Sequence, residues 1–255
     1  LSQVETTTGA IVVNEAPALK SAMDAIVNLV DEGQFEITPE GLSLRAMDPS
    51  QISMVSFHMP KMSFVEYHVE DTMKIGLDMA QLSNVLSRGN KGEKAELSVE
   101  EGRLVVRFIM DKKKRTFKIP LLEIGEGVQR EPKIEFKSFV KVGADALKEA
   151  LKDAKLVSSH VRFVLESDSF TVEVKGDGGD VKAEFEKGSP AIGEIHVSGD
   201  AKATFPLQYL EDIVKASSGS SMVTLNLETD RPLRVEYEIE GAKVAYFLAP
   251  RIETE

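Results

Sequence analysis

The sequence predicts an α+β protein made of two similar halves, each with helices that cover one face of antiparallel sheets. Three observations lead to this fold class. The second half repeats the apolar pattern of the first at a fixed spacing of 128 residues. Apolar residues at helical spacing give way along the chain to strand-like alternation. Short glycine-containing turns separate the alternating stretches, as expected for strands that pair with their sequence neighbours.

The internal repeat begins in a helix and continues through the whole half. The segment ALKSA at Ala18–Ala22 corresponds to ALKEA at Ala146–Ala150. The spacing stays at 128 and becomes 129 after one inserted residue, as in Phe35 with Phe163, Leu97 with Leu225, and Phe117 with Tyr246. A register held over this length predicts a duplicated domain.

Each half is expected to contain the same elements in the same order. In the first half, Leu19, Met23, Ile26 and Val30 form one apolar stripe and predict a helix. Two strands around a turn at 39–41, a short helix at 79–86 and a hairpin with its turn at 100–102 follow. The second half predicts helices at Ala144–Val157 and Pro206–Ala216, and strands at Val161–Glu166, Ser169–Lys175, Met222–Leu227 and Leu233–Ile239.

Two glycine-containing segments between these elements have different interpretations. Residues 121–132 contain two glycines and a proline, which predicts an extended connector between domains at 1–120 and 133–255. Gly176–Asp180 could be a metal or phosphate loop, but its position in the repeat favours a simple turn.

The composition limits the possible functions. The chain has 255 residues, a net charge of −11 and a pI of about 5.0, which by itself argues against nucleic-acid binding. No cysteine is present, so disulfides, thiol nucleophiles and thiolate metal sites are excluded. No apolar run approaches the ~18 residues of a membrane span. We therefore expect a soluble, intracellular protein.

No constellation of catalytic residues is visible in the sequence. The four histidines are His58, His68, His160 and His196. No two of them have the spacing of a metal-binding pair. There is no phosphate-binding loop and no nucleophile–base pair. An enzyme with duplicated halves would need a polar cluster between them, which the sequence does not reveal. We expect no catalytic residues, no metal and no cofactor.

Four segments of the sequence are distinctive when taken together. They are LRAMDPSQISMV at Leu44–Val55, TFPLQYL at Thr204–Leu210, RPLRVEY at Arg231–Tyr237 and YFLAPRIE at Tyr246–Glu253. These segments resemble the proliferating cell nuclear antigen family, the DNA polymerase sliding clamps of archaea and eukaryotes. The first is similar to the family's signature segment and the last to its C-terminal segment. The resemblance covers the chain from about Ala16 to Glu253 and is nearer to archaeal members. It gives residues 1–10 no role.

This resemblance implies a head-to-tail homotrimer that closes around double-stranded DNA, with helices lining the hole and sheets outside. It implies sequence-independent DNA binding at the nucleoid. It also implies docking of DNA polymerase, clamp loader, flap endonuclease and ligase through short peptide motifs. Two alternatives remain: a subunit of a heterotrimeric or checkpoint-type clamp, and a peptide-binding adaptor that does not encircle DNA.

The residues expected to face DNA are basic and lie on the four helices or at their ends. They are Lys20, Arg88, Lys148, Lys152, Lys155 and Lys215. Lys148, Lys152 and Lys155 occupy positions i, i+4 and i+7 opposite an apolar stripe. Acidic neighbours dilute their charge, so we expect weak, salt-dependent contacts that suit sliding.

The resemblance also implies two protein-binding surfaces. The partner-peptide pocket consists of Met47, Gln51, Ile52, Met54, Val128, Pro206, Pro232, Phe247, Ala249, Pro250 and Ile252. The subunit interface is expected to join the strand Arg115–Ile119 to Asp180–Glu186 of the next chain by edge pairing. Its contact residues are Arg115, Phe117, Lys118, Val181, Glu184 and Glu186.

Overall fold

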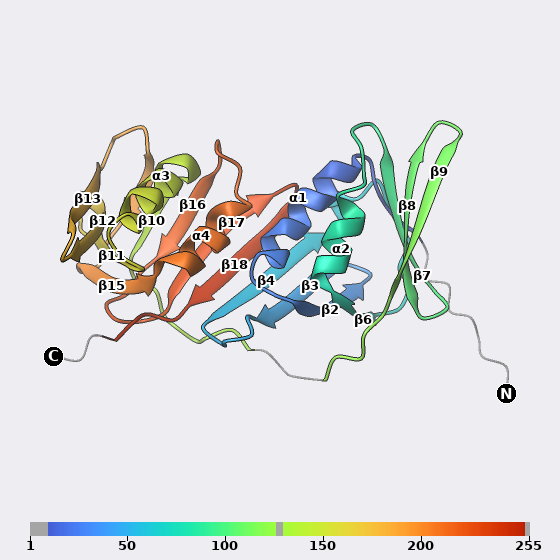
Figure 1. Ribbon diagram of the computed structural model, residues 1–255, viewed down its shortest axis with the longest axis horizontal. Coiled ribbons are helices and arrows are strands. Elements are labelled where there is room, and N and C mark those ends of the chain that lie inside the picture. The colour runs from blue at the N-terminus through green and yellow to red at the C-terminus, as the bar shows by residue number, and fades with distance from the viewer. Residues whose placement is uncertain (1–9, 126–129, 253–255) are drawn as a thin grey trace. The chain divides into compact units, whose positions relative to one another are not determined.

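The computed structural model describes residues 10–125 and 130–252, which form two compact units (Figure 1). Among the described residues, the first unit contains 10–49, 56–125 and 239–243, and the second contains 50–55, 130–238 and 244–252. Each half of the chain runs through a strand, a helix, five strands, a second helix and three strands. This identical order confirms the duplication predicted from the sequence repeat.

The elements of the two halves correspond one to one. The first half contains β1 (Ile11–Val13), α1 (Ala16–Val27), β2 (Glu32–Thr38), β3 (Gly41–Met47), β4 (Ser53–Pro60), a 3-10 turn (Lys61–Ser63), β5 (Glu66–Tyr67), β6 (Met73–Asp78), α2 (Met79–Leu86), β7 (Lys94–Glu100), β8 (Arg103–Met110) and β9 (Lys113–Pro120). The second half contains β10 (Phe139–Gly143), α3 (Ala144–Lys155), β11 (His160–Leu165), β12 (Ser169–Gly176), β13 (Gly179–Glu186), β14 (Ile192–His196), β15 (Ala201–Pro206), α4 (Leu207–Lys215), β16 (Met222–Asn226), β17 (Leu233–Ile239) and β18 (Ala242–Leu248).

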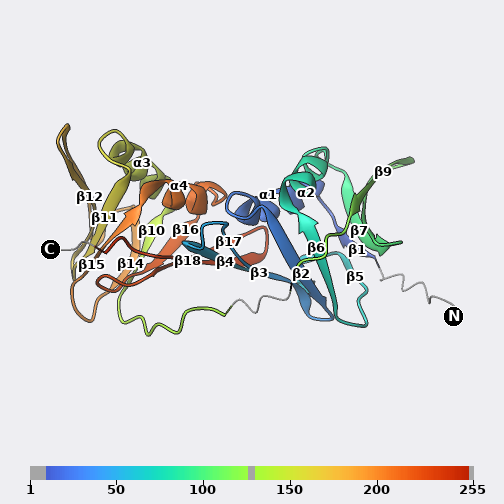
Figure 2. The same cartoon turned by 60° about the horizontal axis from the view of Figure 1, so that its bottom comes forward.

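The sheets of the two halves repeat the same strand order. In the first half the orders are β5-β1-β7-β8-β9 and β4-β3-β2-β6, and in the second they are β14-β10-β16-β17-β18 and β13-β12-β11-β15. Figure 2 shows α1 and α2 on the same side of their sheets, and α3 and α4 on the same side of theirs. Both β9 and β13 lie at the end of a strand order, so each leaves one edge without a partner strand in the described chain.

Local sequence explains where the elements begin and turn. The Asp78 side chain caps α2 by accepting a hydrogen bond from the Gln81 N–H at 2.8 Å. The hairpins β7–β8 and β17–β18 both turn at Glu-Gly, and all four residues have positive φ, from 49° at Glu101 and Glu240 to 80° at Gly241. Two successive left-handed residues match the twist of a tight hairpin. These paired turns are a second structural trace of the duplication.

The sequence predicted most of the helices closely and some of the strands. Gly176–Asp180 forms the β12–β13 turn, in which Gly176 pairs with Gly179, so the expected turn is confirmed. The helix expected to reach Val157 ends at Lys155. Strands β1, β4, β5, β6, β10, β14, β15 and β18 were not delimited by the sequence patterns. Within the described residues, no helix is long and apolar enough to cross a membrane.

Aromatic rings fill the core of the second unit. Phe163 is fully buried and its ring centroid lies 5.3 Å from Phe170 and 5.8 Å from Phe205. Nearby, the Tyr237 hydroxyl donates to the Ile213 carbonyl at 2.7 Å and lies 2.8 Å from the Tyr246 hydroxyl. Burial raises the pKa of both tyrosines above the ordinary value.

We expect the stability of the protein to fall as pH rises above ~10, the pKa of tyrosine in an unfolded chain. Because the pKa values are raised in the folded state, the hydroxyls stay neutral there while those of the unfolded chain ionise. The contribution of the two tyrosines to the free energy of unfolding is therefore complete below pH ~10 and is lost as the pH rises above it. Each tyrosine should remove about 1.4 kcal/mol per pH unit. Urea unfolding at pH 8, 10 and 11 measures this loss. Tyr246→Phe should make the decline shallower, and an unchanged slope would contradict the assignment.

Candidate functional site

Three of the predicted DNA-facing cations line one groove between α3 and α4. The groove has a volume of about 320 Å³ and includes Lys148, Lys152 and Lys215. Its other polar residues are Gln208, Glu211 and Asp212. Leu151 and Val214 complete the lining. Leu147, Leu210 and Ile213 are buried and do not line the groove. The two helices therefore present a mixed polar face, positive at the lysines and interrupted by carboxylates.

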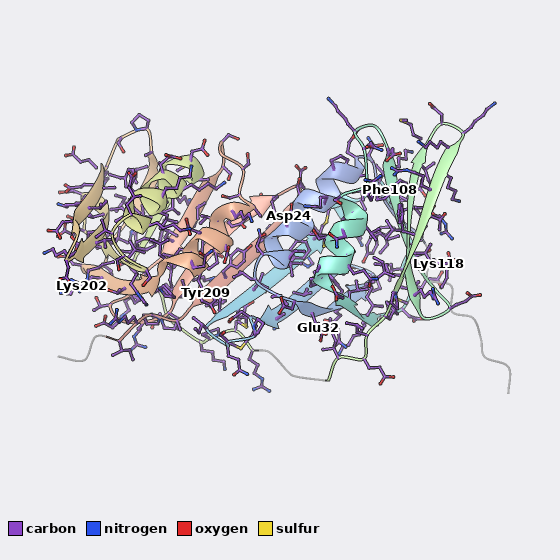
Figure 3. All side chains as sticks on the ribbon, in the orientation of Figure 1. Asp24, Glu32, Phe108, Lys118, Lys202 and Tyr209 are labelled. Atoms are coloured by element: carbon purple, nitrogen blue, oxygen red, sulfur yellow. The ribbon has the colours of Figure 1, made fainter. Side chains whose placement is uncertain are left out.

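Most of the six predicted DNA-facing cations have polar partners within the chain. Lys20 on α1 pairs with Asp24 at 2.5 Å, and Figure 3 labels Asp24 on that helix. Lys152 pairs with Glu149 at 2.5 Å, and Lys155 reaches across to Glu211 on α4 at 2.7 Å. The Lys152–Glu149 and Lys155–Glu211 pairs are largely exposed on the lysine side, so water screens them and they exchange readily.

The environment of the Lys148 side chain differs from the one predicted from the sequence. Its side chain is half-buried, and its ammonium donates to the Ser217 carbonyl at 2.6 Å instead of standing in the solvent stripe with Lys152 and Lys155. Burial lowers the pKa of Lys148. The Lys148 side chain thus links α3 to the C-terminal end of α4. Arg88 and Lys215 are exposed.

Six of the predicted partner-pocket residues form a half-buried or exposed set in the second unit, which we call the docking strip. They are Ile52, Pro206, Pro232, Ala249, Pro250 and Ile252. The Ala249 N–H donates to the Ile52 carbonyl at 3.0 Å, and the Arg251 N–H donates to the Thr204 carbonyl at 2.7 Å. These bonds hold the C-terminal segment beside both the start of β4 and the edge of β15. Ile252 is 74% exposed, which is unusual for a large apolar side chain.

The remaining pocket residues have different positions. Met54 and Phe247 are 4% and 5% exposed, so they support the strip from beneath instead of forming its surface. Gln51 is exposed and adopts a positive φ of 58°. Met47 belongs to the first unit, and Val128 lies outside the described residues. Sequence reasoning missed Arg234, whose guanidinium lies 5.6 Å from the centre of the Phe247 ring.

The free edge strands β9 and β13 each have two distinct faces. On β9, Lys114, Thr116 and Lys118 are exposed, whereas Arg115, Phe117 and Ile119 are half-buried or buried. On β13, Lys182, Glu184 and Glu186 are exposed, whereas Val181, Ala183 and Phe185 are half-buried. Both edges thus alternate between a charged outer face and a partly apolar inner face.

Arg115 belongs to the inner face of β9 and makes three contacts within the chain. Its guanidinium lies 2.5 Å from the carboxylate of Glu93, donates to the Arg88 carbonyl at 2.7 Å, and stacks 5.2 Å from the Phe108 ring centre. Glu93 is 1% exposed. A hydrogen bond from the Asn90 N–H, and then Arg115, lowers the pKa of Glu93. Arg115 therefore has a structural role that the sequence did not indicate.

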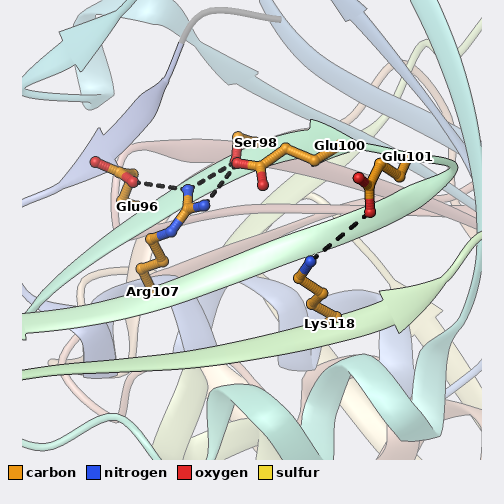
Figure 4. A network of polar contacts seen from close by, with 6 residues as sticks. All are labelled: Glu96, Ser98, Glu100, Glu101, Arg107 and Lys118. Atoms are coloured by element: carbon orange, nitrogen blue, oxygen red, sulfur yellow. Dashed lines mark hydrogen bonds and ion pairs between the residues drawn. The ribbon is translucent and has the colours of Figure 1, made fainter. Parts of the chain in front are cut away.

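Lys118 is much less constrained than its neighbour Arg107 (Figure 4). Arg107 lies 3.0 Å from Glu96 and 2.6 Å from Glu100, and it also donates to Ser98. Lys118 reaches only Glu101, at 4.0 Å, and its side chain is 45% exposed. Lys118 is consequently a cation of this sheet that can change partners at little cost.

The described residues contain no group of three or more histidine, aspartate or glutamate side chains arranged to hold a metal ion. The surface features described above are the α3–α4 groove, the docking strip and the edges of β9 and β13.

Comparison with known proteins gives a consistent result across the whole described chain. Residues 10–124 match the model of the proliferating cell nuclear antigen N-terminal domain, and residues 130–252 match that of the C-terminal domain. A DNA polymerase sliding clamp of Methanococcus maripaludis is 36% identical over 241 residues, covering 92% of this chain and 96% of the relative. DNA polymerase sliding clamp 1 of Pyrobaculum aerophilum is 36% identical over 233 residues, covering 91% and 93%.

Solved structures agree with these relatives. The crystal structure of PCNA from Thermococcus kodakaraensis superposes with a TM-score of 0.91 at 27% identity, covering 96% of this chain and 100% of that one. PCNA of A. fulgidus bound to the C-terminal region of FEN-1 superposes with a TM-score of 0.86 at 29% identity, covering 96% and 99%. The chain therefore belongs to the proliferating cell nuclear antigen family, the sliding clamps of DNA polymerase.

Proposed function

We propose that this protein is a non-enzymatic sliding clamp whose copies join head to tail into a trimeric ring around duplex DNA. Residues 1–120 and 133–255 are the two clamp domains, and 121–132 connects them. The ring works in the cytoplasm at the nucleoid. It binds DNA without reading sequence and tethers proteins that carry short docking motifs.

The correspondence of β9 and β13 with strands inside the chain carries this proposal. The repeat makes β9 the counterpart of β18 and β13 the counterpart of β4. Within the second unit, the segment after β18 is hydrogen-bonded to the segment before β4, through Ala249 and Ile52. The same relation between β9 of one copy and β13 of the next would use both free edges. Contacts between two different surfaces of identical chains can close into a ring.

The two edges are complementary in chemistry. The outer face of β9 offers Lys114 and Lys118, and that of β13 offers Glu184 and Glu186. On the inner faces, the half-buried Phe117 would meet the half-buried side of β13 that carries Val181. Cross-strand pairs of this kind stabilise antiparallel strands. Arg115 supports the contact from within by fixing β9 on Glu93.

Retention on closed DNA tests the ring directly. Loaded by a clamp loader onto a nicked circular duplex, the protein should remain bound through gel filtration at moderate salt. Cutting the circle once should release it, because only topology holds a ring whose phosphate contacts are weak. Equal retention on circular and linear DNA would refute encirclement, and it would favour a simple DNA-binding protein.

Replacing two competing carboxylates should strengthen DNA binding. In Glu149→Gln/Glu211→Gln, Lys152 and Lys155 lose their ion-pair partners and become available to phosphates. We expect tighter duplex binding by about five- to tenfold at low salt, with a steeper dependence on salt. Fluorescence anisotropy across a salt series measures both quantities. Glu240→Gln/Glu238→Gln is the matched control, because both residues are exposed and lie on β17 and its turn. An equal gain in the control would show that net charge alone is responsible.

The docking strip is the proposed site for partner proteins. The half-buried Ile52 and Pro250 and the exposed Ile252 offer apolar contacts for the aromatic and aliphatic anchors of a short peptide. The A. fulgidus relative, which was solved with the C-terminal region of FEN-1, supports this assignment. The proposed partners are DNA polymerase, clamp loader, flap endonuclease and ligase. A peptide with such anchors should bind wild type and fail to bind Ile252→Asp, as measured by calorimetry.

A further inference from the structure

The second unit carries a hollow of about 160 Å³ that belongs to none of the surfaces described above. Its polar lining consists of Ser158, His160, Arg162, Glu173, Lys175 and Thr204, together with Arg251. These residues come from β11 and the loop before it, from β12 and β15, and from the segment after β18. Because Phe163 is buried and strand side chains alternate, Arg162 points to the opposite face of the sheet from the core.

The lining has an excess of positive charge. Arg162, Lys175 and Arg251 are cations, and Glu173, directly opposite Arg162 in the strand register, is the one carboxylate of the lining. Burial, and after it the Arg251 guanidinium, lowers the pKa of His160. Arg251 therefore acts on His160 across the hollow. This local charge contrasts with the net charge of −11 carried by the whole chain.

The hollow adjoins the docking strip at two points. Arg251 stands between Pro250 and Ile252 of the strip, and its N–H is bonded to the Thr204 carbonyl at 2.7 Å. His160 lies opposite Pro206, another residue of the strip, in the β11–β15 register. A peptide that lies along the strip therefore has the basic hollow beside it, within reach of its next few residues.

From this placement we propose that the hollow is a second subsite for docking segments, which binds the carboxylates of acidic residues flanking the apolar motif. The inference rests on the proposed partner-docking role of the strip. Guanidinium and ammonium groups form charge-assisted hydrogen bonds with carboxylates, and these are stronger than neutral ones. The chain as a whole has a net charge of −11, so this local group of cations beside the strip selects which partners bind and in which register.

Three peptides with one shared apolar motif test the proposal. The first has neutral flanks, the second has two aspartates on the amino side, and the third has two aspartates on the carboxyl side. We expect one acidic peptide to bind wild type about fivefold more tightly than the neutral peptide at low salt, and this advantage to shrink in ~0.5 M salt. Isothermal calorimetry gives each Kd.

Two variants separate the subsite from general electrostatics. Arg162→Gln/Lys175→Gln should remove the acidic advantage and leave the neutral peptide's Kd unchanged, while Arg162→Lys/Lys175→Arg should keep the advantage. The matched control is the single substitution Lys202→Gln, whose effect on the acidic advantage is compared with that of the single substitution Arg162→Gln. Lys202 lies exposed on β15 of the same sheet but outside the hollow, and Figure 3 labels it. The Lys202→Gln chain should keep the advantage.

Each outcome bears on one proposal. If the neutral peptide binds and neither acidic peptide gains, the subsite is wrong and the docking strip stands. If no peptide binds, the docking function itself is wrong. An equal loss in Lys202→Gln overturns the subsite in favour of long-range charge. Binding of a short single-stranded DNA that is lost in Arg162→Gln/Lys175→Gln and displaces the acidic peptide would make the hollow a phosphate site, which also overturns the proposal.

Discussion

Reversing the charge of Lys114 and Lys118 is expected to convert the assembled protein into single chains. Both side chains are exposed on the outer face of the free edge β9, where the proposed contact needs cations opposite Glu184 and Glu186. Lys114→Glu/Lys118→Glu places like charges opposite each other on paired strands, which is destabilising. Light scattering should report a mass near 28.0 kDa for the variant, compared with three times that mass for the wild type.

Arg115 is left intact in this experiment, because its partner Glu93 is buried and its loss would disturb the fold of β9 itself. Adding Glu184→Lys/Glu186→Lys to the same chain should restore the assembly by exchanging the two signs. A matched control is Lys91→Glu/Lys112→Glu, which changes the charge equally at exposed positions outside the strands. If the β9 variant keeps the full mass, the edge-to-edge contact is not the interface.

The largest loss of stability is expected from Phe163→Ala. Phe163 is fully buried between Phe170 and Phe205, so its removal takes away ring contacts and leaves a cavity. We expect the free energy of unfolding to fall by about 3–5 kcal/mol. Guanidinium unfolding should be measured in the Lys114→Glu/Lys118→Glu chain, so that assembly does not contribute.

Two substitutions calibrate this effect. Phe163→Leu keeps most of the volume and should cost less than about 1.5 kcal/mol. Val164→Ala changes the half-exposed neighbour on the other face of β11 and should also cost little. A cost of Phe163→Ala below that of Val164→Ala would contradict the view that the ring cluster holds this sheet together. Since β13 belongs to the same sheet, we also expect Phe163→Ala to weaken assembly.

The sequence predicted the fold where its signals were local. The stripe of Leu19, Met23 and Ile26 defined α1, and the turn at 100–102 marked the β7–β8 hairpin. Strands such as β4 and β18 were harder to delimit, because their consecutive buried residues lack a clear alternation of two. Short strands such as β5, with two residues, form only because longer neighbours provide a register.

The candidate surfaces were predicted as sets of residues but not as contacts. The family resemblance identified Ile52, Pro250 and Ile252, yet gave no sign that Met54 is buried. The bonds from Lys148 to Ser217 and from Arg115 to Glu93 join residues far apart in sequence, so only the folded chain brings them together. The basic hollow was missed for the same reason, because Arg251 meets β11 and β12 only through its bond to β15.

The unlike chemistry of the two free edges has a consequence for direction. If every junction places a basic β9 edge on an acidic β13 edge, each copy points the same way around the circle, and no twofold axis relates the two sides of the disc. The ring then has two different faces, and all docking strips lie on the same one. Such a ring, once threaded on DNA, would hold all of its bound partners on the side that faces one end of the double helix.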